Sequence, residues 1–128
     1  MLPLLVDQGV SCVPWSPLAR GLLARAGVES GTNTLRSRTD NMIDERYENA
    51  NPDVLASLAG VAREYGLPSA QIALAWLLRQ PAVTSAVVGV AKTSHVDDAV
   101  SALDIKLSED ELVRLSEHYR AQEVVGHE

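Results

Sequence analysis

The stretch TSAVVGV, residues 84–90, is apolar almost throughout after its first two residues. Strands that are covered on both faces have continuous apolar sequences of this kind, and they occur mostly in parallel sheets. A second short apolar run, GVSCVPW at residues 9–15, is followed by Pro17, which together with Pro14 prevents it from continuing as a strand. The sequence therefore predicts two buried parallel strands, over residues 9–15 and 84–90.

Helical periodicity fills much of the chain between these two runs. Apolar residues recur at helical spacing between Asn51, where we expect a helix to open, and Gly66, where we expect it to stop. The next run, residues 69–80, has little polar face, so it predicts a helix that is buried on most sides and capped by Ser69. The polar stretch 28–51 shows no sustained period and is interpreted as a long loop.

Two shorter helices are predicted after the second strand. Ser94 and Asp97 have the spacing of a capping box, and Ser108 and Glu111 repeat it. Strands that alternate with helices are typical of an α/β protein with parallel strands. We therefore expect the α/β class, with about two strands and four or more helices.

Size and composition restrict the class of protein. We expect the 128 residues to form one domain, 1–128. A formal net charge of −6 without a cluster of basic residues argues against a nucleic-acid partner. The single cysteine, Cys12, excludes a disulfide or a cysteine-based metal site within one chain and favours a reducing, cytoplasmic location. The first ten residues lack the features of a signal peptide or a membrane span, so we expect no membrane partner.

Two parallel strands do not make a stable sheet. They cannot bury both faces or pair both edges, and stable sheets usually contain several strands. The rest of the sequence offers no further convincing strand. We therefore expect this chain either to assemble with another polypeptide or to be a piece of a larger fold.

Three segments together carry a family resemblance. VPWSPLARGLL (13–23), LRSRTD (35–40) and IALAWLLRQPAVTSAVVGVAKTSHVDDAVSALDIKLSEDEL (72–112) resemble the C-terminal portion of an aldo-keto reductase. The resemblance is to the bacterial reductases related to the potassium-channel beta subunits, and it runs from about Leu4 to the tail. It implies part of an eight-stranded (β/α)8 TIM barrel, in which this chain is similar to the last two βα units.

The resemblance implies that the loops after both strands bind the cofactor NADP(H). In such barrels the functional loops follow the C-terminal ends of the strands. The first loop would place Trp15 against the nicotinamide, with the phosphates lined by the residues around the turn. These implied contacts are Trp15, Ser16, Pro17, Leu18 and Arg20.

The second loop combines Gly89, the cation Lys92 and a helix start, which together suit an anion. By resemblance, Ala91 and Lys92 would approach the 2'-phosphate of the adenosine ribose, and His95 would lie near it. Asp98 would hydrogen-bond the adenine amino group. The channel-subunit branch often has asparagine at the neighbouring position, which is Ala99 here, so we expect an adenine contact from that position to be absent. Arg36, or its neighbour Arg38, matches an arginine of the long loop that can lie over the cofactor.

Taken one at a time, the same residues also have structural interpretations. Without the family resemblance, the pattern favours a core tryptophan at a strand end for Trp15. Lys92 and His95 also fit a solvated first helical turn, and Asp98 fits a side chain that complements the helix dipole.

No catalytic residue and no metal site is predicted. Family members use an aspartate, a tyrosine, a lysine and a histidine, and nothing in this chain matches those positions. Tyr47, Tyr65 and Tyr119 do not lie in an equivalent context, and the three histidines lack metal-ligand spacing.

These observations lead to two functional hypotheses. In the first, the chain is a fragment of an oxidoreductase whose parent activity is NADP(H)-dependent reduction of aldehydes or ketones. It would then be inactive alone, or one half of a split reductase that needs a complementing barrel half. In the second, it is a non-catalytic interaction module that associates with itself or with partner subunits.

Overall fold

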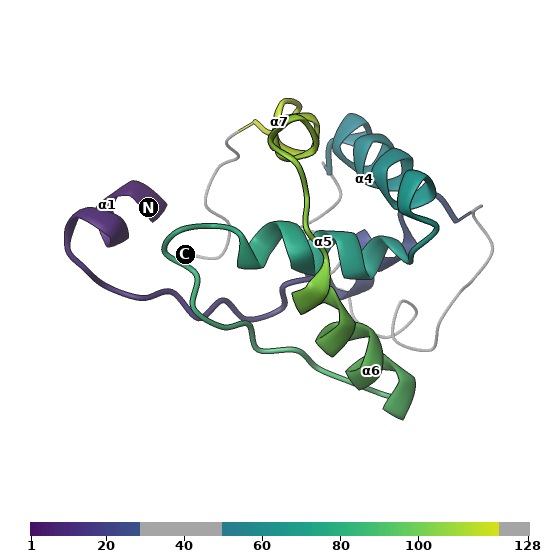
Figure 1. Ribbon diagram of the computed structural model, residues 1–128, viewed down its shortest axis with the longest axis horizontal. Helices are drawn as coiled ribbons and strands as arrows, with labels where there is room; N and C mark the ends of the chain where they lie inside the picture. The colour runs from purple at the N-terminus through teal and green to yellow at the C-terminus, as the bar shows by residue number, and fades with distance from the viewer. Residues whose placement is uncertain (29–49, 121–128) are drawn as a thin grey trace, which may run out of the picture.

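The helix that the sequence predicts to be the most buried, α5 (Ser69–Leu78), lies at the centre of the fold (Figure 1). The computed structural model describes residues 1–28 and 50–120. In this part of the chain, α5 contacts both α4 (Pro52–Tyr65) and α6 (Thr93–Ser101). The other helices are arranged around it.

The core forms mainly where α5 meets α4. Ile72 of α5 and Val61 of α4 are the largest fully buried side chains of the described residues. Burying an aliphatic side chain of this size contributes about 1.5–3 kcal/mol. The buried members of the core cluster are Ala26, Leu58, Ala59, Val61, Ala62, Ile72, Ala73, Ala75 and Leu107. Contacts between helices therefore hold the described part of the chain together.

The predicted ends of α4 are confirmed. Asn51 is the N-cap, and its side chain accepts a hydrogen bond from the backbone N–H of Asp53 at 2.9 Å. Pro52 occupies the first helical position, where its missing N–H costs nothing. Gly66 ends the helix with φ at +64°, a left-handed conformation that glycine adopts without steric strain.

The capping box of α7 (Glu109–Ser116) is confirmed as well. The Ser108 side chain accepts from the N–H of Glu111 at 3.3 Å, and the Glu111 carboxylate accepts from the N–H of Ser108 at 2.6 Å. The Tyr65 hydroxyl donates to the same carboxylate at 2.8 Å, which joins α7 to α4. The Ser108 N–H, and after it the Tyr65 hydroxyl, hold the pKa of Glu111 below its ordinary value.

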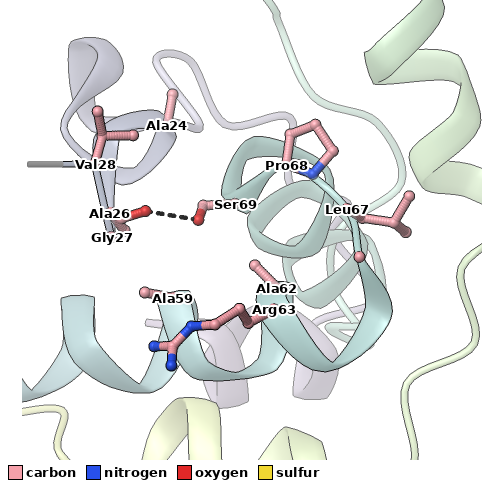
Figure 2. Close-up of a pocket in the computed structure, with 11 residues that line it drawn as sticks. Ala24, Ala26, Gly27, Val28, Ala59, Ala62, Arg63, Leu67, Pro68 and Ser69 are labelled. Carbon is pink, nitrogen blue, oxygen red and sulfur yellow. Dashed lines mark hydrogen bonds between the residues drawn. The ribbon is translucent and has the colours of Figure 1, made fainter. Parts of the chain in front are cut away.

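Two other predicted caps are wrong. Ser69 is the first residue of α5, with Pro68 at the cap, and its hydroxyl instead donates to the carbonyl of Ala26 at 2.9 Å (Figure 2). Ser94 lies inside α6, which begins one residue earlier, with Lys92 at the cap and no side-chain cap bond. A serine caps a helix only from the non-helical residue before it, so a shift of one residue at Ser69 and of two at Ser94 removes the cap.

Four smaller elements complete the described fold. They are α1 (Leu2–Asp7), which the sequence did not predict, and the 3₁₀ helices η1 (Ala19–Gly21), η2 (Leu23–Arg25) and η3 (Ala102–Asp104). No helix in residues 1–28 and 50–120 is both long and apolar enough to cross a membrane. The long loop predicted over residues 28–51 and the tail beyond residue 120 lie almost wholly outside the described residues.

The two predicted strands, over residues 9–15 and 84–90, are not confirmed as strands. Instead, the segment after α1 and the segment that starts at Ala82 meet at two isolated parallel bridges, Cys12 with Val83 and Trp15 with Val87. Three backbone hydrogen bonds join them, from Cys12 to Ala82 at 2.7 Å, from Thr84 to Cys12 at 3.1 Å and from Val87 to Pro14 at 2.9 Å.

The interruption of this ladder has a physical reason. Pro14 has no N–H, so this segment cannot donate a hydrogen bond midway between the two bridges. Val13 and Val87 are also 54% and 57% exposed, so the apolar sequence that predicts burial on both faces is left uncovered. The parallel direction was predicted correctly, but the regular sheet was not.

We expect Ser108→Ala to lower the free energy of unfolding by about 1 kcal/mol, because it removes the side-chain cap of α7. Urea denaturation measures this loss. Ser94→Ala is the matched control, since Ser94 is exposed and lies inside α6, and we expect a change within about 0.5 kcal/mol. Equal losses from the two variants would contradict the start assigned to α6.

Candidate functional site

The two predicted cofactor loops lie side by side in the structure. The bridge between Trp15 and Val87 places the ends of the two paired segments together. The loops that follow enclose a cavity of about 630 Å³. Eight of the predicted site residues line it, namely Trp15, Ser16, Pro17, Leu18, Arg20, Gly89, Ala91 and His95. Residues that are distant in the sequence are therefore assembled into one site.

The first loop has an unusual backbone. Ser16, Ala19 and Arg20 have φ values of 48°, 48° and 54°, a left-handed conformation that side chains other than glycine rarely adopt. The carbonyls of Ser16 and Leu18 accept hydrogen bonds from the N–H groups of Ala19 and Gly21, each at 2.9 Å. These bonds hold a tight double turn. Such strain clusters at functional sites, where a fixed backbone shape is part of the function.

The second loop leaves open space beside its glycine. A Cβ atom placed on Gly89 would meet no atom within 4 Å, so no neighbouring segment of the described chain requires the glycine. The N–H of Ala91 points to Nδ1 of His95 at 3.5 Å, a long contact across the first turn of α6. The imidazole of His95 thereby lies at the edge of the cavity.

The cavity has a cationic lining. Arg20 and Arg25 are the charged residues of its described lining, and none of the described lining residues carries a carboxylate. Opposite charge attracts a ligand most strongly where the surface is concave. The arrangement therefore suits an anionic ligand, although the chain as a whole is acidic.

Sequence reasoning missed several lining residues. Arg25 is the most important of them, and a Cβ on Gly21 would lie 3.3 Å from its guanidinium. The sequence contained a signal, since LARGLLAR carries two arginines five residues apart in the same turn. The remaining missed residues are Gly21, Ala24, Val87 and Val88.

Two predicted site residues lie outside this lining, and a third is not among the described residues. Lys92 is exposed at the N-cap of α6 and does not line the cavity. Asp98 also lies outside the lining, and its Oδ1 accepts a hydrogen bond from Nε2 of Gln71 at 2.8 Å. Arg36, with its neighbour Arg38, falls outside the described residues.

A second cavity, of about 470 Å³, lies between the end of α4, the start of α5 and the chain after η2 (Figure 2). Its described lining is mostly apolar and differs from the set of described residues that the sequence predicts for the site. The hydrogen bond from Ser69 to Ala26 crosses this region.

Tyr65 has a structural role in the described fold. Its single hydroxyl proton is shared between the Glu111 carboxylate at 2.8 Å and the carbonyl of Lys106 at 3.1 Å. The bond to Glu111 raises the pKa of this hydroxyl, because the neighbouring carboxylate favours the protonated phenol. Among the described residues, no group of three or more histidine, cysteine, aspartate and glutamate side chains lies close enough to hold a metal ion.

The structure thus has two loops that follow parallel paired segments and line one cavity, whose described charged residues are arginines. The model of the Aldo/keto reductase family matches residues 1–120. The chain belongs to this family, whose relatives named below are oxidoreductases.

Individual relatives agree with this assignment. The chain is 34% identical over 123 residues to versiconal hemiacetal acetate reductase of Aspergillus parasiticus, covering 93% of this chain and 35% of the relative. It is 33% identical over 128 residues to L-glyceraldehyde 3-phosphate reductase of Escherichia coli O157:H7, covering 92% of this chain and 36% of that protein. The chain thus spans about a third of the length of these relatives.

The structure agrees as well. It matches the crystal structure of a thermostable aldo-keto reductase in complex with the inhibitor epalrestat, with a TM-score of 0.64 and 27% sequence identity. That match covers 91% of this chain and 32% of the other. The described helices and paired segments therefore follow part of the aldo-keto reductase fold.

The strained turn gives a direct test. We expect Ala19→Gly to leave the free energy of unfolding unchanged or to raise it, because glycine relieves a positive φ that costs other residues about 1–2 kcal/mol. Ala24→Gly is the matched control, since Ala24 lies in η2 without a positive φ, and we expect a loss of about 0.5–1 kcal/mol. Chemical denaturation measures both, and equal losses would show that the turn is not strained.

Proposed function

We propose that this chain forms part of the NADP(H) site of a reductase that acts on aldehydes or ketones. The observation that carries the proposal is the cavity of about 630 Å³, because both loops implied by the family resemblance line it. Cavities of this size accommodate ligands as large as organic cofactors. The described part of its lining carries arginines and no carboxylate, which suits the phosphates of a dinucleotide.

The first loop would hold the nicotinamide end. Trp15 is 62% exposed, so a large flat surface is available for a flat ring. This exposure favours a binding role over the core tryptophan that the sequence left open. Ser16 and Leu18 belong to the rigid turn, which loses little freedom on binding, while Arg20 and Arg25 supply positive charge for the pyrophosphate.

The second loop and α6 would hold the adenosine end. Gly89 and Ala91 line the cavity, and Lys92 lies next to them at the N-cap of α6. An ammonium group at this position suits the 2'-phosphate that distinguishes NADP(H) from NAD(H). We propose that His95 lies beside this phosphate and that Asp98 accepts from the adenine amino group.

The parent activity would be carbonyl reduction within a (β/α)8 barrel. The bound cofactor would supply the hydride, and this chain would bind and orient the cofactor without providing the proton donor. Further residues of the aldo-keto reductase fold would cover the exposed apolar residues of the paired segments, such as Val13 and Val87. Without that cover we expect no reductase activity from the chain alone.

Titration with NADPH tests the proposal. We expect saturable binding, detected by nicotinamide fluorescence, and a Kd about fivefold to tenfold weaker in Trp15→Ala, because the aromatic contact is lost. Trp76→Phe is the matched control, because Trp76 bonds to Ser116 on α7 and does not line the cavity. If the wild-type chain bound no dinucleotide, the proposal would fall and the interaction module would be favoured.

Lys92→Ala tests which dinucleotide the site prefers. We expect the ratio of NADPH to NADH affinity to fall about tenfold, because only NADPH carries the phosphate that the ammonium would contact. Lys106→Ala, which removes an exposed lysine outside the cavity lining, should leave the ratio unchanged. An unaltered ratio in Lys92→Ala would remove Lys92 from the site.

A further inference from the structure

We infer that Gln71 is a positioning residue for the adenine end of the cofactor. Its side-chain amide would fix the Asp98 carboxylate, so that one oxygen faces α5 and the other remains for the adenine amino group. This inference rests on the proposed function and deepens it, because it assigns the recognition of the base to a pair of residues on two helices.

Gln71 stands out among the buried residues. Within residues 1–28 and 50–120 it is one of two buried polar residues, with 7% of its surface exposed, and it lies on the otherwise apolar α5. Its Nε2 donates to Oδ1 of Asp98, 27 residues away on α6, at 2.8 Å. A buried amide on an apolar helix is costly unless it is hydrogen-bonded, so this bond fixes both groups.

The carboxylate is constrained from one side. Hydrogen bonds that involve an ionised group are short and strong, and 2.8 Å is typical of them. Among the described residues, no hydrogen bond joins the other oxygen of Asp98. Asp98 is half-buried and lies one turn beyond His95, which lines the cavity. Asp98 therefore has one carboxylate oxygen, held in a fixed orientation, that can accept a hydrogen bond near the proposed adenosine end.

A purely structural role, in which this bond only joins α5 to α6, makes a different prediction. Loss of a structural bond would weaken every dinucleotide alike, whatever its base. Loss of a positioning bond would change the discrimination between bases. The comparison therefore uses NADPH and its hypoxanthine analogue, in which a carbonyl oxygen replaces the adenine amino group. The carbonyl oxygen accepts hydrogen bonds and cannot donate one to a carboxylate, and the N1–H that hypoxanthine gains lies one ring position away from the amino position.

The first experiment measures the Kd of both cofactors on the full chain. We expect the wild type to prefer NADPH about tenfold, and Gln71→Met, which keeps length and loses the donor, to reduce that preference to about twofold. Asp97→Asn is the matched control, because Asp97 is the exposed neighbour of Asp98, and it should keep the wild-type preference. Circular dichroism checks that each variant is folded.

Asp98→Asn tests the orientation without altering the buried residue. Gln71 donates, so it would bind the amide oxygen of the new asparagine and leave the NH₂ group for the base. We expect the preference to reverse toward the hypoxanthine analogue. In the double variant Gln71→Met with Asp98→Asn the amide can turn either way, and the reversal should disappear.

Each outcome decides between the possibilities. Equal wild-type affinity for the two cofactors, an unchanged preference in Gln71→Met, or a loss of the same factor for both cofactors would overturn the positioning role while leaving cofactor binding intact. Absence of reversal in Asp98→Asn would overturn it even if Gln71→Met did not fold. If the wild type bound neither cofactor, the proposed function would fall and this inference with it.

Discussion

The site depends on one backbone hydrogen bond, from the N–H of Val87 to the carbonyl of Pro14 at 2.9 Å. With the bridge between Trp15 and Val87, it joins the ends of two segments that are about seventy residues apart in the chain. Both candidate loops begin there, so their separation is set before any side chain contributes. Because a proline interrupts the donors of the first segment, few other bonds share this task. The cavity wall is therefore determined by the backbone, and the side chains determine what the cavity binds.

Helix α5 forms hydrogen bonds to the segments that follow both loops. Its two buried polar residues, Ser69 and Gln71, bond in different directions: Ser69 to Ala26 after the first loop, and Gln71 to Asp98 after the second. All other buried positions of this helix are apolar. A hydrophobic contact is non-directional, whereas a hydrogen bond fixes orientation. The polar exceptions on an apolar helix thus define how the segments bearing the site are held.

The sequence predicted the elements better than their junctions. Helical periodicity placed α4 and α5 within a residue or two, because apolar burial averages over many positions. The caps predicted at Ser69 and Ser94 were wrong, because a cap depends on the conformation of a single residue. The cap at Ser108 succeeded because Glu111 is present to complete the reciprocal bonds. The prediction of regular strands was wrong for another reason, because a ladder of hydrogen bonds depends on neighbouring strands.

Within the site, the loop motifs were visible in the sequence and their partners were not. The tryptophan, serine and proline of the first loop follow one another, so a family resemblance could identify them together. Gln71 and Asp98 lie 27 residues apart on helices that both have ordinary amphipathic or apolar patterns. Nothing local distinguishes this glutamine from a solvated one, and only the packing of α6 against α5 brings the two side chains together.

The charge of the cavity lining differs in sign from the net charge of the chain. A net charge of −6 over the chain argues against a nucleic-acid partner, yet it says nothing about the charge of a single cavity. The first loop places two arginines on the cavity wall, while the described capping carboxylates, such as Glu111, lie at the start of α7. The fold places basic and acidic side chains at different positions, whereas the net charge only gives their sum. An acidic chain can therefore carry a cationic site, because short-range positions and not totals set the potential that a ligand meets.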